Sequence, residues 1–208
     1  MHPRPAPRGN DVDNLLRALL PASRSIDTFN SFIGRWVSWL IFAAVVVSSV
    51  NAIVRKAFDM SSNAWLELQW VLFSAVFLLC SPWTLIANEH IRIDIVNNLL
   101  PKKVRNWIDL IGHAFFLMPL TIIMIATGIP FFLKSWRLDE QSFSAGGLPQ
   151  WPAKSLVMIG FALLFLQCLS ELVKRAAVMR GLISDPHESY RPPVEAEVEH
   201  LVEAIEKR

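Results

Sequence analysis

Four long apolar runs, separated by short polar links, dominate the pattern of this chain. They cover about residues 36–54, 66–87, 112–133 and 155–173. At about 1.5 Å per residue, a helix over each run is long enough to cross a hydrocarbon core of roughly 30 Å. The pattern therefore predicts an all-α integral membrane protein with four transmembrane helices. Pro101 and Pro152 stand where a helix would begin, a position that suits proline.

The polar segments divide the chain into three parts. We expect a cytoplasmic N-terminal arm over residues 1–28, a four-helix membrane domain over 29–181 and a cytoplasmic C-terminal tail over 182–208. The tail carries an apolar helical stripe from Val194 to Ile205, so it either docks on a cytoplasmic partner or stays a mobile acidic segment. The string "SSVNA" after the first run resembles a signal-peptide cleavage site. Because a long polar arm precedes this run and three more runs follow it, we expect an uncleaved anchor.

The distribution of Lys and Arg predicts the orientation of the spans, because these residues are retained beside cytoplasmic ends. With the N-terminus inside, eleven bases fall on the cytoplasmic side and five on the outer side. The inner set is Arg4, Arg8, Arg17, Arg24, Arg92, Lys102, Lys103, Arg105, Lys174, Arg175 and Arg180, and the outer set is Arg55, Lys56, Lys134, Arg137 and Lys154. All eight Trp lie toward span ends, as in an aromatic belt. Both termini are therefore expected inside.

Composition agrees with a membrane protein, since 53% of the residues are hydrophobic and only 18% are charged. Ionisable residues inside a membrane usually mark an ion or proton path. Here Glu67, Asp109, His113 and Glu171 all fall near the ends of the runs, not in their middles. The chain is therefore predicted to lack an ion site of its own and to hold another protein in the membrane. The two cysteines lie within apolar runs, so we expect no structural disulfide.

The link "LIANEHIRIDIVNNLLPKKVRNWIDL", residues 85–110, is unusually polar for a segment between two spans. An apolar stripe formed by Ile91, Ile95, Val96, Leu99 and Leu100 predicts a short amphipathic helix at the cytoplasmic interface. Its bases would then face phosphates and anionic lipid. Ile93 breaks the stripe, and a solvated loop whose bases only fix the topology is the alternative.

Two strings of the sequence resemble a known family. They are "WLELQWVLFSAVFLLCSPWTLIANEHIRIDIV", followed by "LP" and a basic cluster, and "SWRLDEQSFSAGGLPQWPAKSLVMIGFALLFLQCLSELVKR". Both are similar to the small membrane subunit of tripartite ATP-independent periplasmic (TRAP) transporters. The second string carries that family's acid-x-Ser and Gly-Leu-Pro-x-Trp-Pro-x-Lys elements. The resemblance covers about residues 30–181 and keeps the order and spacing of the four spans.

The resemblance implies a small subunit of a heteromeric secondary transporter in the bacterial inner membrane. In this family a periplasmic binding protein delivers an organic anion to a membrane pair, and a sodium gradient drives uptake. The large membrane subunit carries the substrate and sodium sites, and the small subunit braces it. We therefore expect three partners, namely the large subunit, the binding protein and membrane lipids. No nucleic acid, cofactor, metal or enzymatic activity is expected.

The resemblance also gives candidate interface residues. The family's outer acid and aromatic pattern falls on Trp65, Glu67, Gln69 and Trp70, its loop signature falls on His90, Arg92 and Asp94, and the basic cluster is Lys102, Lys103 and Arg105. Glu67 either offsets the positive N-terminal end of the second span or contacts a partner. His90 and Arg92 are expected to contact headgroups or to be structural, and His113 is expected to be a hydrogen-bonded histidine at the interface.

Two other protein classes share a pattern of four spans. A membrane anchor of a respiratory oxidoreductase would hold haem between two histidines, and only His113 approaches a span. A proton-coupled drug exporter would need an acid within the bilayer, whereas Glu67 lies near its outer edge. The oxidoreductase anchor remains the alternative function.

Overall fold

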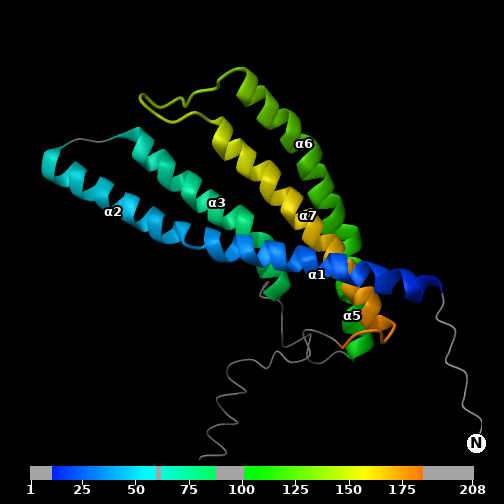
Figure 1. Cartoon of the computed structure of the whole chain (residues 1–208). Helices are drawn as coiled ribbons and strands as arrows, with labels where there is room; N and C mark the ends of the chain where they lie inside the picture. The colour runs from blue at the N-terminus through cyan, green and yellow to red at the C-terminus, as the bar shows by residue number, and fades with distance from the viewer. Residues whose placement is uncertain (1–10, 60–61, 88–100, 185–208) are drawn as a thin grey trace, which may run out of the picture.

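The computed structural model describes residues 11–59, 62–87 and 101–184, except for the side chains of Lys102 and Lys103. Its elements are α1 (Asp11–Val37), α2 (Leu40–Phe58), α3 (Asn63–Ala87), α5 (Lys102–Ile111), the π-helical segment η1 (Gly112–Leu117), α6 (Met118–Arg137) and α7 (Trp151–Met179) (Figure 1). The described residues contain four helical segments long and apolar enough to cross a membrane. Each predicted run lies within one of them, which confirms the all-α fold and the four spans.

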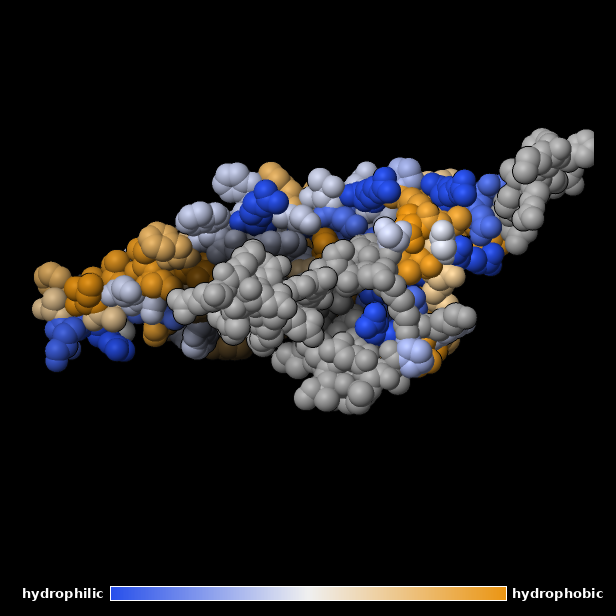
Figure 2. Space-filling model, turned by 90° about the horizontal axis from the view of Figure 1, so that it is seen from below, coloured by the Kyte–Doolittle hydropathy of each residue, from blue (hydrophilic) through white to orange (hydrophobic). Residues whose placement is uncertain are grey.

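The four spans lie side by side in the order α2, α3, α7, α6 (Figure 1). α2 packs on α3, α3 on α7 and α7 on α6, while α2 and α6 stand at opposite ends of this row. Seen from below in Figure 2, the described residues form an elongated body rather than a round one. The spans therefore form an open layer with two broad faces, and α1 crosses α3 and α7 near one end of the layer.

α7 is the central helix of the layer and holds nine of the described buried residues, more than any other element. Close helix contact depends on small residues along it and its neighbours. A Cβ atom on Gly160 would lie 2.8 Å from Leu78 Cβ and 3.0 Å from the Leu78 carbonyl oxygen, so α3 approaches α7 at a distance that only glycine permits. At Gly128, by contrast, a Cβ atom would meet the backbone of Met158 at an ordinary 3.6 Å.

α1 and α2 follow one another with a tight turn between them. Trp39 N donates to the Trp36 carbonyl at 3.2 Å and Phe42 N donates to the Trp39 carbonyl at 3.1 Å. Each of these hydrogen bonds joins residues three apart in the sequence, as in a 3₁₀ turn. Together the two helices cover 48 residues, far more than a hydrocarbon core of about 30 Å requires. α2, with 19 residues, is long enough to span by itself. α1 is therefore not needed for the span, and it packs across the end of the layer instead.

Proline positions explain two local features. Pro152 lies in the first turn of α7 and Pro101 caps α5 in an extended conformation, as the sequence indicated. Pro119 stands at the start of α6, directly after η1, and has no N–H to donate to the preceding turn. There the backbone N–H of Met118 bonds to the carbonyl of His113, five residues earlier, so one wider turn leads the helix into the proline.

Several predictions from the sequence fall outside the described residues. They are the apolar stripe at 91–100, the side chains of His90, Arg92, Asp94, Lys102 and Lys103, and the helical stripe of the C-terminal tail. α5 itself is amphipathic, with Val104, Trp107, Ile108 and Ile111 exposed on one side.

Candidate partner and lipid interface

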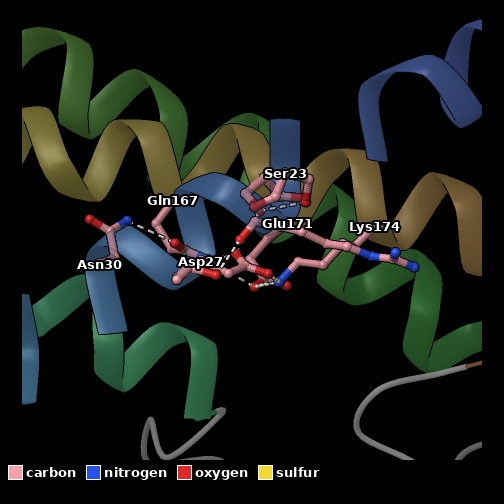
Figure 3. A network of polar contacts seen from close by, with 9 residues as sticks. Ser23, Asp27, Asn30, Gln167, Glu171 and Lys174 are labelled. Carbon is pink, nitrogen blue, oxygen red and sulfur yellow. Dashed lines mark hydrogen bonds and ion pairs between the residues drawn. The ribbon is translucent and has the colours of Figure 1, made fainter. Parts of the chain in front are cut away.

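A network of polar side chains joins α1 to α7 (Figure 3). Asp27 on α1 is its centre. Its carboxylate accepts hydrogen bonds from Ser170 Oγ at 2.7 Å and Gln167 Nε2 at 2.8 Å, and it pairs with Lys174 Nζ at 2.9 Å. Because Ser170 gives its proton to Asp27, the 2.7 Å contact between Ser23 Oγ and Ser170 Oγ has Ser23 as the donor. A continuous chain of donors therefore ends on one carboxylate.

The network extends along α1 and α7 into the buried region. Asn30 Nδ2 donates to Gln167 Oε1 at 2.8 Å, and Lys174 Nζ also pairs with Glu171 Oε1 at 2.5 Å. Asn30 and Gln167 are almost completely buried. Buried polar groups are costly unless they are hydrogen-bonded, so this pairing favours one register of α1 on α7 over any shifted one.

A second polar contact joins α5 to α7. Arg175 Nη2 lies 3.1 Å from Asp109 Oδ2, and both side chains are at least nine-tenths buried. Arg175 also donates to Asn106 Oδ1 at 3.4 Å. Since Lys174 pairs with α1 and the next residue pairs with α5, adjacent bases on α7 hold helices on two of its sides. Arg180, just after α7, adds an exposed pair with Asp13 on α1 at 3.3 Å.

His113 and the two cysteines have structural contacts at this end of the layer. His113 Nδ1 lies 2.6 Å from the Asp109 carbonyl, and the His113 carbonyl accepts a hydrogen bond from Cys168 Sγ at 3.4 Å. His113 is thus the hydrogen-bonded histidine that the sequence indicated, although it is buried between helices. Cys80 Sγ makes a similar contact to the Gly34 carbonyl at 3.5 Å, where α1 crosses α3.

At the opposite end, Glu67 organises the loop between α6 and α7. Its carboxylate accepts hydrogen bonds from Ser142 Oγ and, at 2.7 Å, from the backbone N–H of Leu148. A Cβ atom on Gly147 would lie 2.5 Å from Ser142 Cβ, so a larger residue would shift the loop that holds Glu67. Asn63, one turn earlier on α3, donates to the Ala145 carbonyl at 3.0 Å. Glu67 therefore binds a loop of its own chain, a role that neither expectation for it included.

The same loop is closed at its base by an ion pair between Glu140 and Lys154. Hydrogen bonding to Lys154 holds the pKa of Glu140 below its ordinary value. Lys154 Nζ also lies 4.3 Å from the centre of the Phe131 ring, and the rings of Trp136 and Trp151 meet edge to face at 4.7 Å. The end of α6 and the start of α7 are thereby held together.

The structure separates the candidate residues into groups. Trp65 and Trp70 on α3 are exposed, Gln69 is half-buried, and only Glu67 of this set faces the loop. Arg105 is half-buried on α5, at the other end of the layer. The described candidates, which lie at opposite ends of the layer, therefore do not form one site. The network around Asp27 was not among them, although its members on α7 recur at helical spacing.

The family comparison covers the core of this layer. Residues 44–178 match the model of the family described as "Tripartite ATP-independent periplasmic transporters, DctQ component". The matched region runs from within α2 to the end of α7 and leaves α1 outside. Comparison with curated proteins and with solved structures gave no significant match. Because the family model matches well over half of the chain, this protein belongs to the DctQ family, the small component of TRAP transporters.

Proposed function

We propose that the chain is the scaffold subunit of a sodium-coupled, binding-protein-dependent transporter for organic anions and that it braces the large transport subunit. Family membership supports the transporter class. Sodium coupling, an organic anion as substrate and a periplasmic binding protein as partner follow from the resemblance to TRAP transporters. The further steps rest on the distribution of polar groups within the spans.

The observation that carries the scaffold role is the chemistry of the span interiors. Residues 40–54, 68–87, 114–133 and 155–170 contain no Asp, Glu, Lys, Arg or His. The hydroxyls of Thr84, Thr121 and Thr127 donate to carbonyls of their own helices at 3.1, 2.8 and 2.8 Å. Such groups offer little to a sodium ion or a carboxylate. The ion and substrate sites are therefore assigned to the large subunit.

The open layer suits a bracing role, because it offers large apolar faces to another membrane protein. α2 exposes Phe42 and Ile53, and α6 with η1 exposes Phe115, Phe116 and Ile123. Polar contacts at both ends of the layer support this packing, because those around Asp27 join α1 to α7 and those around Glu67 join α3 to the α6–α7 loop. A layer held in this way presents a rigid surface rather than a moving gate.

The scaffold is proposed to lie in the bacterial inner membrane with both termini in the cytoplasm. The start of α1 lies beside the end of α7, as the pair between Asp13 and Arg180 shows. The excess of bases at this end favours the cytoplasmic side. Single cysteines introduced at Ser61 and Ala145 should therefore react with a membrane-impermeant thiol reagent in intact cells lacking the outer membrane.

Matched cysteines at Asn98 and Glu188 should react only after the cells are opened. The reversed pattern would contradict the orientation. Co-expression with the large subunit tests the bracing role itself, because a tag on this chain should retain the large subunit through solubilisation and purification. Recovery of the chain alone, with the large subunit stable in the same membranes, would contradict it.

A further inference from the structure

α1 has three different sides, and only one of them faces the protein. Leu16, Ser23, Asn30 and Gly34 are buried against α3 and α7. Arg17, Arg24 and Arg35 are exposed and lie two and three whole helical turns apart, so they share a second side. We call these three residues the arginine stripe. The exposed aromatic residues Phe29, Phe32 and Trp36 lie on the third side, away from the protein.

Among the described residues, the arginine stripe has no partner, because the acids of α1 point elsewhere. Asp27 turns inward to Lys174, and Asp13 pairs with Arg180. Among the described contacts, the Arg24 guanidinium makes no ion pair or hydrogen bond. Figure 2 shows hydrophilic side chains beside hydrophobic ones along the upper edge, which α1 forms. The outer surface of α1 is therefore positively charged beside an apolar strip.

An open groove of about 520 Å³ lies where the two kinds of side chain meet, and Arg24, Ser25, Thr28, Phe29 and Phe32 line it. Ser25 and Thr28 donate their hydroxyl protons to the carbonyls of Pro21 and Arg24 at 3.1 and 2.9 Å, so their oxygens still have lone pairs for a donor from outside. The two phenylalanines are 54% and 60% exposed. The groove thus offers a cation, acceptor oxygens and an apolar wall.

The position of α1 relative to the bilayer decides what meets this groove. Arg35, near the end of α1, and Arg55, near the end of α2, stand before and after the first span. At about 1.5 Å per residue they are about 30 Å apart along the two consecutive helices, which matches the hydrocarbon thickness. Arg35 lies in the last turn of α1, so the earlier turns of α1 continue from this point at the level of the headgroups. There a guanidinium meets phosphate in a two-point contact, and aromatic side chains meet the first carbons of the acyl chains.

We propose that the groove around Arg24 binds one anionic phospholipid whose headgroup carries hydroxyl groups, as in phosphatidylglycerol. Arg24 binds the phosphate, Ser25 and Thr28 accept hydrogen bonds from the headgroup hydroxyls, and Phe29 and Phe32 contact the acyl chains. Arg17 and Arg35 add to the attraction along the same side of the helix. This site is formed by residues of α1 and requires no transport activity.

Native mass spectrometry of the full-length chain in detergent tests the site, with phosphatidylglycerol and phosphatidylcholine of identical acyl chains as probes. The first phosphatidylglycerol should bind more tightly than phosphatidylcholine. Arg24→Gln should weaken the affinity for the first phosphatidylglycerol about fivefold, since a base near a phosphate layer contributes on the order of 1 kcal/mol. The same substitution should leave the affinity for phosphatidylcholine unchanged. Arg24→Lys keeps the charge and should weaken the affinity for phosphatidylglycerol less than Arg24→Gln does.

Arg55→Gln is the matched control, because Arg55 is an exposed arginine at the far end of α2. It should leave the first phosphatidylglycerol at wild-type affinity. Equal weakening by Arg24→Gln and Arg55→Gln would show diffuse attraction and overturn the site. Wild-type lipid affinity in Arg24→Gln would also overturn it, and loss of large-subunit retention in that variant would then identify the groove as a protein contact.

Discussion

Asp27→Asn is the substitution that should release α1 from α7. The side chain keeps its size, and its oxygen can still accept from Ser170. Its new NH₂ group, however, points a donor at Lys174 Nζ, which lay 2.9 Å from the carboxylate. Asp27 and Lys174 have only 22% and 12% of their side-chain surfaces exposed, so water replaces little of the lost interaction.

The size of the effect follows from these contacts. Hydrogen bonds to a charged group contribute about 1.5–3 kcal/mol, and Glu171 remains to pair with Lys174. We therefore expect the free energy of docking α1 to fall by about 2 kcal/mol. Hydrogen exchange of the backbone amides of α1 should become about 30-fold faster, if exchange proceeds through undocking of the helix.

Asp13→Asn provides the control, since it makes the same chemical change on the same helix. Its partner Arg180 is 44% exposed, and surface pairs contribute about 0–1 kcal/mol. Exchange in α1 should then rise no more than about fivefold. In a double-mutant cycle, Lys174→Met should cost less in the Asp27→Asn protein than in the wild type. Equal exchange in the two aspartate variants would refute the proposed role of the network.

Three further predictions concern other parts of the layer. Gly160→Ala should lower the free energy of unfolding by about 1–3 kcal/mol in thermal or denaturant melts, because the methyl group meets the α3 backbone, whereas Gly128→Ala should be neutral or stabilising. A spin label at Ala145 should become more mobile as the pH falls below the ordinary glutamate pKa. Since Lys154 lowers the pKa of Glu140, their ion pair stabilises the loop above that ordinary value and is lost as the carboxylate is protonated at lower pH. Arg92→Glu should reduce the yield of complex with the large subunit, because it reverses a headgroup attraction of about 1 kcal/mol per base.

A different result would contradict each of these three predictions. Equal melting of the two glycine variants would show that α3 and α7 separate easily at Gly160. A label whose mobility depends on pH in Glu140→Gln as strongly as in the wild type would assign the titration to another group. Wild-type co-purification and melting of Arg92→Glu would leave the link at 85–110 as a topological tether only.

The spans could be predicted from the sequence because hydropathy over about 20 residues is a local property. The docking of α1 was not predicted, since its apolar residues cover only one side and its mean hydropathy is low. The residues Ser23, Asp27 and Asn30 recur at helical spacing and signal a polar side of a helix. Their partners on α7 lie more than 130 residues away, and no local pattern identifies such pairs.

The candidate residues show the same limit. Glu67 could be selected because it matches the acid of the family's acid and aromatic pattern. Its role depended on Ser142 and Leu148, which approach only when the α6–α7 loop folds back over α3. The family resemblance contained both the acid and the Gly-Leu-Pro element but not the contact between them. The structure shows that the Gly-Leu-Pro element lies against the Glu67 carboxylate and donates a backbone hydrogen bond to it from Leu148.

Reconstituted uptake tests the scaffold role most directly. Vesicles should contain this chain alone, the large subunit alone or both, each with a loaded binding protein outside and an inward sodium gradient. The proposal predicts sodium-dependent uptake of the bound organic anion only when both subunits are present. Uptake by this chain alone, or full uptake by the large subunit without it, would contradict the proposal.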